Sequence, residues 1–170
     1  TEYYDTVQTM ARLGDDPQYG CGRAMWENHK DNGPYGTTMA LMLLPFWTDG
    51  CIGSMEGLFF EASGTTPYHF LTAAAMSESS SNPVRQLRYE NRDAEVGVRH
   101  LQDLGVRYVM VRTDAAKARA DARPELTLVA ERMEQASGDG ASVSDAGGGA
   151  GIRAAERVQA LMTAVDVPLA

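Results

Sequence analysis

Residues 93–112 read DAEVGVRHLQDLGVRYVMVR, and this stretch decides the fold class. Asp93 is a residue type that often caps helices, and Val96, then His100 or Leu101, and then Leu104 form one apolar helical face. Gly105 can end that helix, and the hydrophobic run that follows it is typical of a strand. A helix joined through one glycine to a strand is an αβ unit. The sequence therefore predicts an α/β domain with a small mixed sheet and flanking helices.

The neighbouring segments supply further elements for the same sheet. Apolar spacing and capping residues predict four more helices, over residues 3–13, 37–44, 66–76 and 114–123. Pro45 is expected to end the second of these helices. Alternating patterns predict two more strands, over residues 22–27 and 125–131, and we expect the later strand to pair with the one after Gly105. Residues 50–64 contain several glycines and are expected to form a loop.

The composition changes near residue 134. Residues 134–151 are rich in glycine, serine and alanine, which is typical of a flexible linker. Residues 152–170 return to apolar spacing of three to four residues and predict a C-terminal helix. The expected organisation is an α/β domain over residues 1–133, a linker, and a helix that docks back or pairs with another chain.

Composition excludes several classes of function. The chain of 170 residues carries a net charge of −8 and has no basic run, which argues against a nucleic-acid partner because phosphate binding needs clustered lysine and arginine. The longest apolar run, MALMLLPFW at residues 39–47, is too short to span a membrane. No cysteine or histidine spacing fits a metal site and no glycine-rich stretch fits a phosphate loop, so we expect neither a metal nor a cofactor.

The two cysteines leave two alternatives open. Cys21 and Cys51 are each flanked by glycine, which allows the close backbone approach that a disulfide needs. They are either two buried thiols or one disulfide. A disulfide would stabilise the fold by about 3–4 kcal/mol and would favour a location outside the cytoplasm.

Two stretches carry a resemblance to a known class of proteins. They are LPFWTDGCIGSMEGLFFEASGTTPYHFL at residues 44–71 and HLQDLGVRYVMVR at residues 100–112. Together they resemble the extracytoplasmic soluble region of large polytopic membrane proteins of high-GC Gram-positive bacteria. Those proteins resemble GT-C-type glycosyltransferases and the membrane proteins called 6-pyruvoyl-tetrahydropterin-synthase-related. The resemblance covers roughly residues 3–130, and proteins of this kind continue with another strand where the pattern of this sequence predicts the linker and the helix.

The resemblance implies a location and a partner. It implies an extracytoplasmic domain, attached to membrane spans outside this sequence, whose partner is the membrane-embedded part of the same protein. It also implies that any glycosyl transfer takes place elsewhere, so no catalytic residue is carried over. The chain begins at Thr1 without a signal-peptide pattern, and we expect it to be a piece of a longer protein.

Aromatic and acidic residues gather in the first half of the chain. Sugars commonly stack on aromatic faces while their hydroxyl groups bond to carboxylates, so this mixture indicates a ligand surface; the alternative is that the aromatics form the core. The candidate ligand-binding residues are Trp47, Asp49, Glu56, Glu61, Tyr68 and His69. We expect a non-catalytic binding domain for a cell-envelope glycan or a lipid-linked sugar. Two alternatives remain: a carbohydrate-active hydrolase that uses Glu56 and Glu61 as acid and base, and a structural interaction domain.

Overall fold

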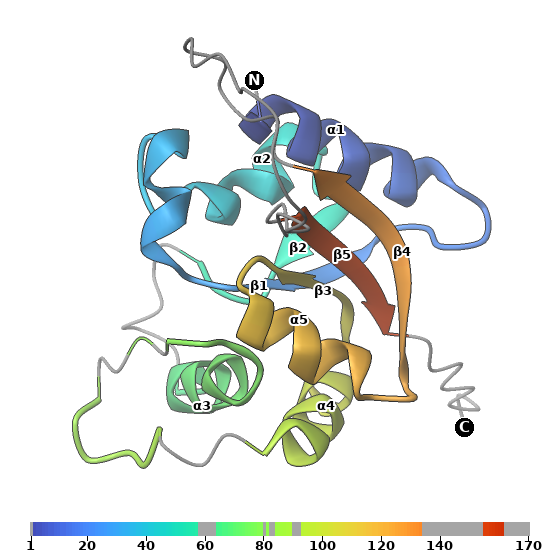
Figure 1. Ribbon diagram of the computed structural model, residues 1–170. Helices are drawn as coiled ribbons and strands as arrows, with labels where there is room; N and C mark the ends of the chain where they lie inside the picture. Colours follow the sequence, from blue (N-terminus) through green and yellow to red (C-terminus); the bar gives the residue numbers. More distant parts are fainter. Residues whose placement is uncertain are drawn as a thin grey trace, which may run out of the picture.

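The chain folds into a sheet between two layers of helices. The computed structural model describes residues 2–57, 64–79, 81, 84–89, 93–133 and 155–161, with the backbone alone for 131–133 and 155–161. Figure 1 shows α1 and α2 on one side of the sheet, and α3, α4 and α5 on the other. The α/β class and the mixed sheet predicted from the sequence are confirmed. Within the described residues, no helix combines the length and the apolar character that a membrane crossing requires.

The sheet has five strands in the order β2-β1-β3-β5-β4. The strands are β1 (Gly22–Trp26), β2 (Ile52–Ser54), β3 (Val106–Val111), β4 (Leu126–Met133) and β5 (Ala155–Leu161). Strand β1 is central and pairs in parallel with both β2 and β3, whereas β5 pairs antiparallel with both β3 and β4. The carboxyl ends of β1, β2 and β3 therefore lie at the same edge of the sheet.

Successive side chains of a strand point to opposite faces of the sheet, so apolar residues on β1 need helices to cover them on both faces. One layer contains α1 (Glu2–Asp15), η1 (Lys30–Tyr35), η2 (Ala40–Leu43) and α2 (Leu44–Trp47), and the other contains α3 (Thr66–Met76), α4 (Ala94–Asp103) and α5 (Asp114–Asp121). Ala24 and Trp26 pack in the core under α1 and α2, whereas Met25 packs in the core under α3, α4 and α5. Both faces of β1 are thus buried, as is typical of a strand inside a parallel sheet.

The predicted helix–strand unit is present with the expected local chemistry. The Asp93 carboxylate accepts hydrogen bonds from the backbone N–H groups of Glu95 and Val96 at 2.9 and 3.2 Å, which caps α4. Gly105 has φ +67°, a left-handed conformation that favours glycine, and β3 begins at the next residue.

Cys21 and Cys51 form a disulfide, so of the two alternatives the disulfide is confirmed. Their Cα atoms lie 4.7 Å apart, and the backbone N–H of Gly22 donates to the carbonyl of Cys51 at 2.9 Å. The bond therefore joins the amino ends of β1 and β2, at the sheet edge opposite the carboxyl ends.

Two local predictions in the first half of the chain are wrong. In place of one helix over 37–44 that ends at Pro45, there is a short 3₁₀ turn, η2, followed by α2, and Pro45 lies in the first turn of α2. Proline is tolerated there because N–H groups in the first turn have no partner within the helix. The region expected to be loop over 50–64 contains strand β2, whose three residues give little local signal and form a strand by pairing with β1.

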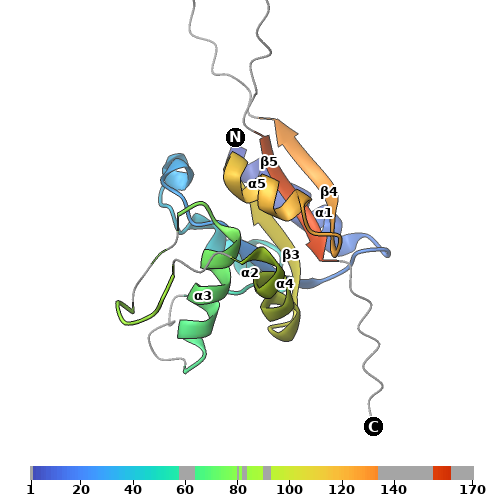
Figure 2. The ribbon, with the colours of Figure 1, turned by 60° about the horizontal axis from the view of Figure 1, so that its bottom comes forward.

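The C-terminal prediction is also corrected. Ala155–Leu161 is strand β5 and not a helix, and Figures 1 and 2 show it beside β4. The expected pairing of β4 with β3 is wrong for the same reason, since β5 lies between them. Backbone groups on β3 and β4 need hydrogen-bond partners, and this tertiary demand overrides the weak helical spacing of the segment. The predicted linker, 134–151, and the remaining residues of 152–170 lie outside the described residues.

Candidate functional site

The topology creates a crevice at the carboxyl ends of β1 and β3. After β1 the chain crosses to β2 on one side, and after β3 it passes through α5 to β4 on the other side. The two connections diverge, so the space above the neighbouring strand ends is left open. In open α/β sheets, ligands bind at such a switch point.

Two adjoining hollows occupy this position, and we call them together the crevice. One has a volume of about 480 Å³ and is lined by His29, Lys30, Asp31, Pro34, Glu78, Arg112, Thr113, Asp114 and Ala115. The other has a volume of about 420 Å³ and is lined by Asn28, His29, Lys30, Glu78, Ser79 and Ser81. The shared residues His29, Lys30 and Glu78 lie where the two hollows meet.

Glu27 is the structural support of the crevice. Its side chain is 2% exposed and lies at the end of β1. One carboxylate oxygen, Oε2, accepts from the backbone N–H groups of Arg112 and Thr113 at 2.8 and 2.9 Å. The other, Oε1, accepts from the Thr113 hydroxyl at 2.8 Å and from the backbone N–H of Glu78 at 2.9 Å. One buried carboxylate therefore holds the end of β1, the start of α5 and the segment that follows α3 in a fixed relation.

His29 lies in the crevice between two carboxylates. Its Nδ1 accepts from the backbone N–H of Asp31 at 3.3 Å and lies 3.2 Å from Asp31 Oδ2, while its Nε2 lies 3.7 Å from Glu78 Oε2. The imidazole side chain is only 11% exposed, and the two carboxylates are about half exposed, at 57% and 49%. The ring is thus held in place, and both acids face solvent at the crevice.

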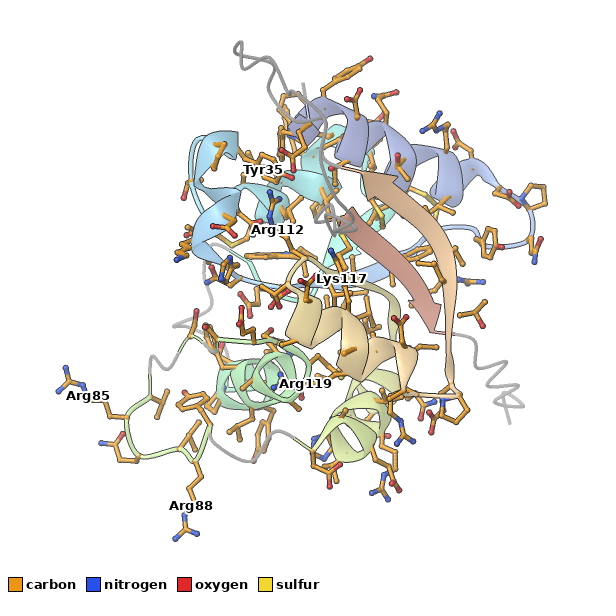
Figure 3. All side chains as sticks on the ribbon, in the orientation of Figure 1. Tyr35, Arg85, Arg88, Arg112, Lys117 and Arg119 are labelled. Carbon is orange, nitrogen blue, oxygen red and sulfur yellow. A yellow bond between two sulfur atoms is a disulfide. The ribbon has the colours of Figure 1, made fainter. Side chains whose placement is uncertain are left out.

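Arg112 forms the wall of the crevice toward α1. Its guanidinium donates to Glu2 Oε1 at 3.0 Å and to the Tyr35 hydroxyl at 2.9 Å, and it stacks over the Tyr35 ring at 5.5 Å. The Tyr35 hydroxyl donates to the same Glu2 oxygen at 2.7 Å. Figure 3 shows Tyr35 beside Arg112. These bonds fix the guanidinium, which is 12% exposed.

The structure does not bring the sequence-predicted site residues together. Trp47 and Asp49 belong to α2 and the turn after it, on the α1 side of the sheet, and both are exposed. Tyr68 and His69 lie on α3 in the opposite layer. Burial lowers the pKa of His69, and the charge of Arg23 lowers it further. Glu61 lies outside the described residues.

Glu56, another of the predicted site residues, follows the carboxyl end of β2 by two positions. Its side chain is 6% exposed, and among the described residues its Oε2 has no hydrogen-bond partner. Burial raises the pKa of Glu56 to about 7. A carboxyl group in this state is protonated in a large fraction of molecules at neutral pH and can donate a proton.

Sequence reasoning missed the residues that line the crevice, including Asn28, His29, Glu78 and Arg112. The available signal was position, because Asn28 follows directly on one predicted strand and Arg112 is the last residue of another. That signal is useful only once the strands are known to be parallel neighbours. Among the described residues, no group of three histidine, cysteine or acidic side chains is placed to hold a metal ion.

Comparisons with protein-family models, with curated proteins and with solved structures found no match for this chain.

Proposed function

We propose that this domain binds a neutral, hydroxyl-rich ligand, such as a glycan, in the crevice, and that it positions this ligand and does not transform it. The observation that carries the proposal is a crevice at the switch point of the sheet, lined by polar side chains of which His29, Arg112 and Thr113 are held in place by the protein's own bonds. Such convergence of fixed polar groups is typical of small-ligand sites.

The lining matches the chemistry of hydroxyl groups, each of which both donates and accepts. Asp31 and Glu78 offer carboxylate oxygens as acceptors, and Lys30 offers an ammonium donor. The Asn28 amide donates a hydrogen bond to the Ser81 hydroxyl at 2.8 Å. This bond fixes the orientation of the whole amide group, including its carbonyl oxygen, which is an acceptor. The acids of the crevice and the net charge of −8 disfavour an anionic ligand.

The location forms part of the proposal. A disulfide is compatible with an extracytoplasmic domain, because such bonds persist in oxidising compartments. In this proposal the domain belongs to a polytopic membrane protein of the glycosyltransferase-like class. It would hold a cell-envelope glycan or a lipid-linked sugar for the membrane-embedded part of the same protein.

A second candidate is hydrolysis of a glycan with Glu56 as the general acid. One observation favours it, the pKa of Glu56 near 7, which is suited to proton donation at neutral pH. Turnover of aryl glycosides that disappears in Glu56→Gln would establish the hydrolase. Absence of turnover across α- and β-linked aryl hexosides would reject it.

The binding proposal is tested by titrating the chain with neutral mono- and oligosaccharides, followed by two-dimensional NMR and calorimetry. Two variants remove crevice groups with little change of shape: Glu78→Gln and His29→Asn, the latter because asparagine can still cap η1. Loss of a hydrogen bond to a charged group should weaken binding about 10- to 100-fold. Asp103→Asn, an exposed acid at the end of α4, is the matched control. Binding that is equal in all four proteins, or no binding by the parent chain, would reject the crevice as the site.

A further inference from the structure

Three exposed apolar side chains form a ridge on η2 and α2. Leu43, Phe46 and Trp47 are 42%, 70% and 51% exposed, and their spacing of three and four residues places them on one face. The rings of Phe46 and Trp47 meet edge to face with centroids 4.8 Å apart. Single exposed apolar residues are common, but a contiguous group of large ones marks an interaction surface. We call these three residues the aromatic ridge.

The indole ring of Trp47 is held in position although half of it is exposed. Its Nε1 donates to the Tyr3 hydroxyl at 3.0 Å, and that hydroxyl donates to the carbonyl of Ala40 at 2.9 Å. The only polar atom of the indole is therefore satisfied within the protein, and the part left for a partner is the carbon surface. A ring fixed before binding loses little conformational entropy when a partner stacks on it.

A continuous set of contacts joins the aromatic ridge to the crevice. The Tyr3 ring lies 5.3 Å from the Tyr35 ring, and the Tyr35 hydroxyl accepts from Arg112, which lines the crevice. Tyr3 and Tyr35 are half-buried, so each still presents part of its surface to solvent. We call Tyr3 and Tyr35 the track, because they lie between Trp47 at one end and Arg112 at the other.

We infer that the ligand is an oligosaccharide chain, bound at one end in the crevice and stacked through a distal sugar ring on Trp47 after passing along the track. This inference rests on the proposed function and names its ligand class. A single sugar would occupy the crevice alone, whereas a chain uses the track and the aromatic ridge as well. Aromatic faces carry a negative quadrupole that attracts the polarised C–H groups of a pyranose ring.

The charge beside the aromatic ridge favours a neutral sugar chain over an anionic lipid surface. Asp49, two residues after Trp47, is exposed. Its carboxylate can accept hydrogen bonds from sugar hydroxyl groups, but it repels lipid phosphate groups.

The test measures affinity against chain length with neutral gluco- and manno-oligosaccharides of one to six rings. The parent chain should bind longer oligomers more tightly up to a plateau. Trp47→Ala should lose about tenfold in affinity for the longest oligomers and nothing for the shortest. Trp47→Phe, which keeps a ring but has no N–H for Tyr3, should recover part of the loss. Tyr68→Ala removes an aromatic side chain of 65% exposure from the opposite layer and is the matched control.

The outcomes separate this inference from the proposed function. Affinity that does not depend on length, or that falls equally for short and long oligomers in Trp47→Ala, overturns the inference while crevice binding stands. Failure to bind any oligomer overturns both. Sedimentation of the parent chain with phosphatidylcholine or anionic phosphatidylglycerol vesicles, abolished in Trp47→Ala, assigns the aromatic ridge to a lipid surface and also overturns the inference. Circular dichroism checks that Trp47→Ala is folded like the parent chain, so that a change in affinity is assigned to the lost indole ring.

Discussion

Replacing Glu27 tests whether the crevice depends on one buried carboxylate. In Glu27→Gln the amide nitrogen must take the place of Oε1, because both partners of Oε2 are backbone N–H groups, which cannot accept. The Thr113 hydroxyl can rotate to accept from the new amide, but the backbone N–H of Glu78 loses its acceptor. One orphaned N–H and the lost charge predict a cost of about 2–3 kcal/mol in the free energy of unfolding.

Glu27→Ala removes the acceptor of all four bonds at once. Four hydrogen bonds to a charged group cannot simply be summed, since at about 1.5–3 kcal/mol each they would match the total stability of a small domain. The folded chain also bears the cost of burying the carboxylate, and this cost offsets much of that sum. Breaking such a buried network costs about 3–5 kcal/mol, and we expect a value in that range.

Urea unfolding at pH 7, followed by tryptophan fluorescence, measures both costs. Glu95→Gln is the control, since that side chain is 60% exposed and its loss should change stability by less than about 0.5 kcal/mol. Hydrogen exchange adds a local readout, because the amide protons of Glu78, Arg112 and Thr113 should exchange faster in both Glu27 variants. A glutamine variant as stable as the control, with unchanged exchange at these amides, would refute the supporting role of Glu27.

Three further predictions concern the rest of the fold. Reducing the Cys21–Cys51 disulfide, which closes a separation of 30 residues, should lower the free energy of unfolding by about 3–4 kcal/mol; an equal urea midpoint with and without reductant would contradict this. Because burial raises the pKa of Glu56 from 4.5 to about 7, its contribution to stability is full below pH 4.5 and decreases by about 3 kcal/mol as the pH rises to 7. Glu56→Gln should lack that decrease, and parallel stability–pH curves for the two proteins would disprove it. Gly97→Ala should cost about 1–3 kcal/mol, because the added Cβ would lie 2.7 Å from the facing alanine side chain of α3, whereas Gly33→Ala, which meets no atom within 4 Å, should be close to neutral in thermal unfolding.

Local interactions explain which elements were predictable. The cap of α4 at Asp93 and the left-handed Gly105 act within one helical turn, so the sequence shows them directly. Strand β2 and strand β5 carry no comparable local signal. They are strands because β1, β3 and β4 offer them hydrogen-bond partners, and such pairing joins residues far apart in the chain.

The residues of the crevice could not be predicted from the sequence for the same reason. Glu56 was a candidate from the start, and burial gives it an unusual pKa, but the other candidates are divided between two layers of the structure. His29, Glu78 and Arg112 have no motif in common, and they lie 34 to 83 positions apart along the chain. They line one crevice because β1 and β3 are parallel neighbours and the connections that follow them diverge.

Composition and local patterns were enough to predict the α/β class, the helix and strand that begin at Asp93, and a charge balance unsuited to nucleic acid. Each of these depends on composition or on contacts within a few residues. Tertiary structure alone decided that Cys21 and Cys51 are bonded, that Ala155–Leu161 is a strand, and that polar groups converge at the ends of β1 and β3. These features follow from the order and direction of the strands, which long-range hydrogen bonding and burial select for the chain as a whole.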